Sequence, residues 1–115
     1  MKRLIKSFVY AFRGLTKTWR EEQNLQVQSL AAVLVIALGL YLNITLSEWI
    51  LLIFVIGLVL LAELVNSAVE RITDVLKPRI NGYVREIKDI MAGAVMLTSV
   101  LAVIVGAMIF LPYIF

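Results

Sequence analysis

Polar side chains recur at helical spacing within an otherwise apolar stretch of the chain, namely Glu63, Asn66, Ser67, Glu70 and Asp74. At about 100° per residue they fall within an arc of about 100°, which predicts one polar stripe along one helix. The apolar run before them begins at Trp49, which places Glu63 about 20 Å along that helix, inside a hydrocarbon layer about 30 Å thick. A carboxylate at that depth indicates a functional site in which it could accept a proton. The simpler alternative is a hydrogen-bonding patch between helices.

Other charged residues are expected at the same depth. If the helices pack, Glu22 faces Glu70 at the cytoplasmic edge of the bilayer, and such a carboxylate pair favours a divalent cation. The chain contains no Cys and no His, so a metal site must use oxygen ligands, which suit Mg²⁺. Lys88, next to Asp89, could meet an anionic phosphate, and Arg3 could turn toward a ligand. Membrane anchoring and ordinary charge placement are the alternatives for the basic residues.

The hydrophobic composition indicates which helices position these candidate site residues. Of the 115 residues, 62% are hydrophobic, which is too much apolar surface for a soluble domain of this size. We predict an all-α membrane protein with a single domain, residues 1–115. An amphipathic surface helix covers residues 1–21, and transmembrane helices cover residues 25–47, 49–72 and 84–112.

Short local signals mark the connections between these helices. Ser47 is the predicted N-cap of the second span, after a tight turn over residues 43–48. Lys77, Pro78 and Asn81-Gly82 are predicted to end that span and reverse the chain. On the third span, small residues recur at every fourth position, which permits close helix packing: Ala94, Thr98, Ala102 and Gly106. Three helices enclose a polar stripe poorly, so we expect the chain to assemble with copies of itself.

The basic residues predict the orientation. All eleven Lys and Arg lie in residues 2–20 and 71–88, and none lies in the connection over residues 43–48. The positive-inside rule then places the N-terminus and the second loop in the cytoplasm and the C-terminus outside. The net charge of +3 is therefore a topology signal, and we expect no nucleic-acid partner.

Several motifs run in order along nearly the whole chain: Arg3-x-x-Lys6, Tyr10-x-x-x-Gly14-Leu15, Glu22, Glu63-x-x-Asn66-Ser67-Ala68-x-Glu70-x-x-x-Asp74, and Lys88-Asp89 with Ala92-Gly93-Ala94-Val95. Together they resemble the bacterial integral-membrane diacylglycerol kinase family, which includes the undecaprenol kinases. The resemblance implies a homotrimer in the bacterial cytoplasmic membrane, with sites between subunits. It also implies phosphorylation of a lipid alcohol that depends on ATP and Mg²⁺.

The resemblance also assigns roles to single residues. Glu63 is similar to the general base that takes the proton from the lipid hydroxyl, and Glu22 and Glu70 are similar to the ligands of the Mg²⁺ that accompanies ATP. The remaining motif residues would bind the nucleotide or complete its polar surroundings: Arg3, Tyr10, Asn66, Asp74, Lys88 and Asp89.

The acceptor is left open between undecaprenol and diacylglycerol. Asn24 and the Lys88–Val95 form of the third span resemble the Gram-positive undecaprenol kinase branch, whereas Gln26 and Gln28 depart from it.

Two other classes of protein are alternatives to a kinase. One is a transporter or channel subunit with a carboxylate-lined cation site, and the other is a purely structural membrane subunit. A conducting path needs polar residues in both leaflets, and the outer half of this chain has almost none.

Overall fold

The computed structural model describes residues 1–76 and 81–115. Within them the chain forms four helices, α1 (Lys2–Glu21), α2 (Gln23–Leu42), α3 (Leu46–Leu76) and α4 (Asn81–Ile114). By length and hydropathy, α2, α3 and α4 are candidates to cross a membrane. The predicted all-helical architecture, an N-terminal helix followed by three apolar helices, is therefore confirmed.

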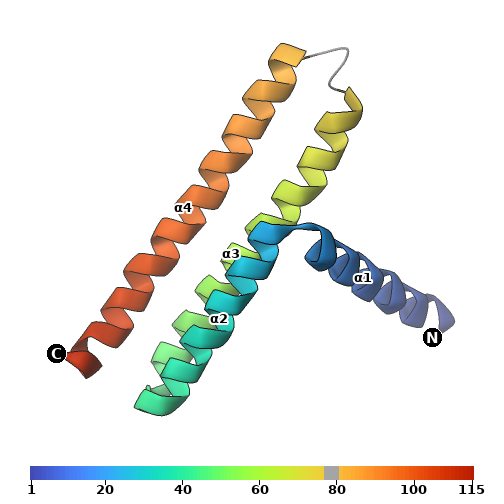
Figure 1. Ribbon diagram of the computed structural model, residues 1–115. Coiled ribbons are helices and arrows are strands. Elements are labelled where there is room, and N and C mark those ends of the chain that lie inside the picture. The colour runs from blue at the N-terminus through green and yellow to red at the C-terminus, as the bar shows by residue number, and fades with distance from the viewer. Residues whose placement is uncertain (77–80) are drawn as a thin grey trace.

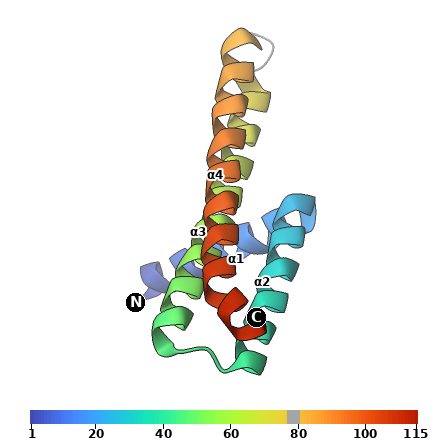
Figure 2. The same cartoon turned by 90° about the vertical axis from the view of Figure 1, so that its left-hand side faces the viewer.

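The helices form a bundle from which α1 leaves sideways (Figure 1). The antiparallel helices α3 and α4 lie side by side, and α2 accompanies only the first part of α3 (Figures 1 and 2). Because α3 has 31 residues, it is about 46 Å long and exceeds a hydrocarbon layer of about 30 Å. We call the last turns of α3 and the first turns of α4 the α3–α4 extension, since they continue beyond α2.

The surface helix α1 buries none of its residues within the chain. Its apolar side, which includes Phe8, Phe12 and Trp19, is exposed, as expected for a helix that lies on a membrane. Glu22 is the single residue between α1 and α2, and its backbone is extended, with φ −110° and ψ 110°. The change of direction between the two helices therefore takes place at one residue.

The connection between α2 and α3 differs from the prediction. α2 ends at Leu42 rather than at residue 47, and Asn43 follows in the left-handed conformation with φ 51°. α3 begins at Leu46, because Thr45 and Glu48 form a reciprocal capping box. The Thr45 amide donates to Glu48 Oε1 at 2.9 Å, and the Glu48 amide donates to Thr45 Oγ1 at 3.3 Å. The prediction of Ser47 as the N-cap is wrong, because Ser47 lies inside the first turn.

The helices of the α3–α4 extension are also longer than predicted. α3 continues to Leu76 and α4 begins at Asn81, so Asn81 and Gly82 belong to a helix rather than to the predicted turn. The predicted break at Lys77 and Pro78 lies outside the described residues. Thr73 and Val84 are almost fully buried, which shows that packing between α3 and α4 supports both helices past the end of their apolar runs.

The best-packed part of the bundle lies at the opposite end, which we call the α2–α3 end. Ile44, Leu52, Ile109 and Phe110 form a buried cluster that Trp49 joins. Gly39 admits the Trp49 ring, since a Cβ atom at residue 39 would lie 2.9 Å from Trp49 Cη2. The Tyr113 hydroxyl donates a hydrogen bond to the Glu48 carboxylate, which joins the end of α4 to the start of α3.

Candidate active site

An acidic cluster forms where α2 and the middle of α3 meet the joint between α1 and α2. Glu63 is only 4% exposed, and the side-chain amide of Gln28 lies within hydrogen-bonding range of its carboxylate. Glu22 and Glu70 are near enough to act on Glu63 electrostatically. We define the acidic cluster as Glu22, Glu63 and Glu70. The helical spacing in the sequence thus corresponds to a shared location, although residue roles stay predictions.

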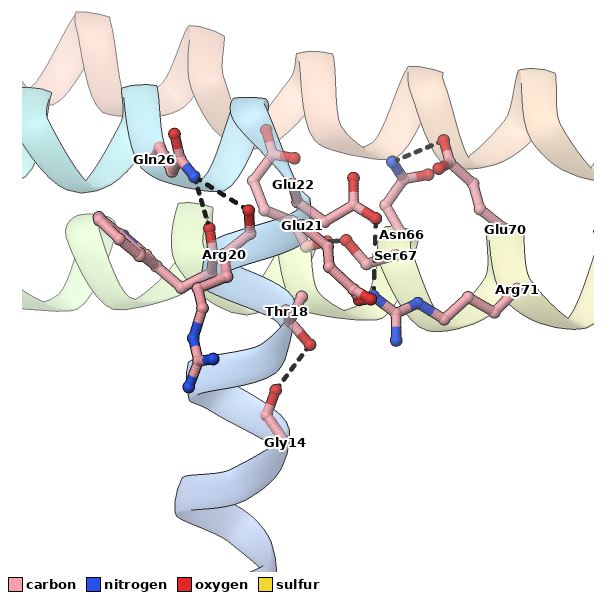
Figure 3. Close-up of polar contacts among 12 residues, drawn as sticks. Gly14, Thr18, Arg20, Glu21, Glu22, Gln26, Asn66, Ser67, Glu70 and Arg71 are labelled. Carbon is pink, nitrogen blue, oxygen red and sulfur yellow. Dashed lines mark hydrogen bonds and ion pairs between the residues drawn. The ribbon is translucent and has the colours of Figure 1, made fainter.

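Hydrogen bonds along α3 fix its part of this cluster. Ser67, which is buried, donates from Oγ to the Glu63 carbonyl at 3.0 Å, and Thr73 Oγ1 donates to the Glu70 carbonyl at 2.9 Å. Asn66 Nδ2 donates to Glu70 Oε1 at 3.4 Å, so an amide orients this carboxylate from the preceding turn (Figure 3). Asn66 therefore supports a predicted metal ligand, besides any contact with substrate.

The joint between α1 and α2 fixes Glu22. Its amide donates to the Thr18 carbonyl at 2.9 Å, which ends α1. Gln26 Nε2 donates to the carbonyls of Trp19 at 2.8 Å and of Arg20 at 3.4 Å (Figure 3). The last carbonyls of a helix lack donors within the helix, so the Gln26 amide supplies the hydrogen-bond donor for two carbonyls at the end of α1. This role of Gln26 was not predicted.

Arg71 connects this joint to α3. Its Nη2 donates to Glu21 Oε2 at 3.4 Å and lies 3.9 Å from Glu22 Oε1 (Figure 3). Arg71 was not among the predicted site residues. Its position directly after Glu70 is the one signal that could have drawn attention to it, because a base beside predicted metal ligands neutralises part of their charge.

Lys88 and Asp74 pair with each other in the α3–α4 extension. Lys88 Nζ lies 2.9 Å from Asp74 Oδ1, one helical turn beyond Glu70 on α3. Asp89, which follows Lys88 on α4, is exposed. The Lys88 side chain is partly exposed, and its contact with a phosphate stays a prediction.

Two predicted nucleotide contacts lie elsewhere. Arg3 is 19 residues before Glu22, which is about 28 Å along α1, a helix that leads away from the bundle (Figure 1). Tyr10 is exposed, and the guanidinium of Arg13 lies 5.5 Å from its ring centroid. One chain therefore does not bring Arg3 or Tyr10 to the acidic cluster.

The carboxylates fit a metal that arrives with a nucleotide better than a metal held by protein alone. Among the described residues, no three Asp, Glu, His or Cys side chains are grouped so that they could hold an ion. Mg²⁺ usually takes one or two protein carboxylates and completes its octahedron with phosphate oxygens and water. Two carboxylates, as predicted for Glu22 and Glu70, would satisfy that requirement.

An apolar groove of about 440 Å³ begins at Gln28 and runs between α2, α3 and α4 toward the α2–α3 end. Small side chains line much of it, among them Ala32, Ala102 and Gly106. No atom of the described chain lies within 4 Å of a Cβ position at Gly106, so the small-residue stripe of α4 borders open space there. The close helix packing predicted from this stripe is therefore not seen at Gly106 within the described chain.

Three helices of membrane-spanning length, with a buried carboxylate near the start of an apolar groove, are features of an integral-membrane protein that could admit an amphiphilic molecule. The sequence model of the family described as prokaryotic diacylglycerol kinase matches residues 9–110. The chain belongs to this family, and it is a lipid kinase.

Individual relatives agree with this assignment. The chain is 36% identical over 112 residues to the undecaprenol kinase of Bacillus subtilis, covering 97% of this chain and 91% of the relative. It is 28% identical over 102 residues to the diacylglycerol kinase of Escherichia coli K12, covering 89% and 84%. A diacylglycerol kinase of Synechocystis is 32% identical over 110 residues, covering 95% and 63%.

Proposed function

We propose that the chain transfers the γ-phosphoryl group of ATP to the hydroxyl of a membrane lipid, with Mg²⁺, at the cytoplasmic face of a bacterial cytoplasmic membrane. The observation that carries this proposal is the position of Glu63, a buried carboxylate beside Gln28 where the apolar groove begins. A lipid alcohol whose chain lies in the groove would present its hydroxyl to this carboxylate.

In the proposed reaction Glu63 accepts the proton of the lipid hydroxyl, and the lipid oxygen attacks the γ-phosphorus as the bond to ADP breaks. Gln28 holds the Glu63 side chain in place. Bound Mg²⁺, held by Glu22 and Glu70, would neutralise charge on the phosphate oxygens. Lys88 adds positive charge there once a phosphate competes with Asp74 for its ammonium group.

A polyprenol such as undecaprenol is the acceptor that we propose, with diacylglycerol as the alternative. The Bacillus subtilis undecaprenol kinase is more similar to this chain than the Escherichia coli diacylglycerol kinase, and it is covered more completely. The groove could also take an extended hydrocarbon chain, because it follows α4 from Ser99 to Phe110, a distance of about 16 Å.

We further propose that the active form is a homotrimer with its N-terminus in the cytoplasm and its C-terminus outside. The spans expose large apolar side chains such as Phe54, Leu97 and Val103, which lipid or other subunits must cover. Arg3 and Tyr10 lie too far along α1 to contact a nucleotide at the acidic cluster of their own chain. They would instead contact a nucleotide at the acidic cluster of a neighbouring copy. The distribution of Lys and Arg supports the orientation.

The test is phosphoryl transfer by the purified protein in lipid nanodiscs with Mg²⁺ and γ-labelled ATP. Undecaprenol, diacylglycerol and ceramide are supplied in separate reactions, and label in the lipid fraction is measured. We expect label in the lipid and the highest kcat/KM with undecaprenol. A higher kcat/KM with diacylglycerol would refute the proposed acceptor, and no label with any lipid alcohol would refute the proposed reaction.

A further inference from the structure

Arg71 is a basic side chain among acids, and the proposed reaction does not use it. Through Nη2 it contacts both Glu21 and Glu22, at 3.4 Å and 3.9 Å, although these residues precede it by about fifty positions (Figure 3). Arg71 stands on α3 directly after Glu70, whereas its two partners end α1 and begin the turn into α2. It therefore joins the two parts of the chain that carry the proposed metal ligands.

The joint needs such a connection for two reasons. α1 has no buried residue, and a single extended residue links it to α2, so packing alone restrains its direction weakly. Glu22 and Glu70 both lie near enough to Glu63 for their charges to repel its carboxylate. The Arg71 guanidinium beside Glu22 offsets that repulsion, and its ion pair with Glu21 fixes the position of the guanidinium.

We propose that Arg71 is a positioning residue that holds the joint between α1 and α2 against α3 and thereby keeps the Glu22 carboxylate in the acidic cluster. Glu21 is the permanent partner, because a guanidinium has several donors in a fixed fork and can keep one carboxylate while another turns to a metal. The inference rests on the proposed role of Glu22 as a metal ligand.

The expected effects are moderate and specific. All three side chains are partly exposed, and an exposed ion pair changes an equilibrium by up to about fivefold. Arg71→Gln and Glu21→Gln should each raise the Mg²⁺ concentration for half-maximal activity by about twofold to fivefold, with kcat changed by less than about twofold. The double variant should be no worse than either single variant, since both remove the same connection.

The charge exchange Arg71→Glu with Glu21→Arg tests the pair directly. It should return the Mg²⁺ requirement toward that of the parent, which a merely structural role of either residue would not predict. Arg85→Gln and Glu86→Gln are matched controls on the exposed side of α4, and they should leave the Mg²⁺ requirement unchanged. Additive single effects, or unchanged Mg²⁺ requirements in both single variants, would overturn the proposal.

A second readout needs no turnover. The chain contains no Cys, so spin labels can be placed at Lys17→Cys on α1 and Val75→Cys on α3, both exposed positions. Labelled chains diluted with unlabelled chains report the distance within one subunit by pulsed electron resonance. In the parent we expect a narrow distribution of distances between the two labels. Arg71→Gln should broaden this distribution, and the charge exchange should narrow it again. An unchanged distribution in Arg71→Gln would overturn the proposal.

These two readouts separate this inference from the proposed function. If Glu22→Gln leaves the Mg²⁺ requirement unchanged, the metal role of Glu22 fails, while the spin-label distances still decide whether Arg71 holds the joint. If the distances respond but the Mg²⁺ requirement does not, the connection is real and its proposed effect on the metal site is wrong.

Discussion

Replacement of the Glu63 carboxylate is the most direct test of the proposed chemistry. Glutamine has nearly the same size and can still hydrogen-bond with Gln28, so Glu63→Gln should fold and assemble like the parent. It cannot act as a base. General-base catalysis contributes about 10²-fold to 10⁴-fold, or about 2.7 to 5.5 kcal/mol at 1.36 kcal/mol per tenfold. We therefore expect kcat to fall by at least about a hundredfold, with the KM for ATP within about twofold of the parent.

The assay is the initial rate of label transfer from ATP to lipid in nanodiscs, with oligomeric state and thermal unfolding measured on the same preparations. Glu48→Gln is the matched control, since it makes the same change on the same helix, fifteen residues earlier, and glutamine also serves in a capping box. Its kcat should stay within about twofold of the parent. Turnover of Glu63→Gln above about one tenth of the parent rate would refute the assignment of the base.

Three further predictions follow from the same geometry. Glu70→Gln should raise the Mg²⁺ concentration for half-maximal activity by about tenfold, and an unchanged Mg²⁺ titration would contradict its role as a ligand. Lys88→Gln should raise the KM for ATP several-fold without changing thermal unfolding by more than a few degrees, whereas an unchanged KM would exclude a phosphate contact. Gly39→Ala should lower the unfolding temperature, because overpacking against Trp49 costs about 1–3 kcal/mol and exceeds the helix preference of Ala, about 1 kcal/mol. Gly57→Ala is its control and should not lower that temperature, because outside the adjoining residues and backbone of its own helix no atom of the described residues lies within 4 Å of the added Cβ.

The overall fold follows from the sequence because a bilayer imposes simple requirements. Uncharged runs of about 20 residues must span, and a short segment with basic and apolar sides must lie at the surface. Helix ends are less predictable, because caps and packing decide them. The apolar run reaches residue 47, yet Asn43 and the Thr45 capping box interrupt the helix before it. Packing between α3 and α4 carries both helices beyond their predicted limits.

The candidate site was partly predictable for a similar reason. Glu63, Asn66, Ser67 and Glu70 belong to one helix, so their spacing alone places them on one face. The contact of Arg71 with Glu21 depends on the angle between α1 and α3, which no local pattern specifies. The contacts that we propose for Arg3 and Tyr10 depend in addition on a neighbouring copy, and the pattern within one chain does not specify that arrangement.

The two ends of the bundle differ in how firmly they are closed, and this has a consequence for substrate access. The buried cluster, the Trp49 contact at Gly39 and the hydrogen bond from Tyr113 lock the spans together at the α2–α3 end. We expect α2 to pivot there, because α4 also packs against α3 along the α3–α4 extension, so that small rotations of α2 become the largest displacements at the depth of Glu63. A long lipid could then enter the groove laterally from the surrounding leaflet, with its hydrocarbon chain leading, while every span stays in the bilayer.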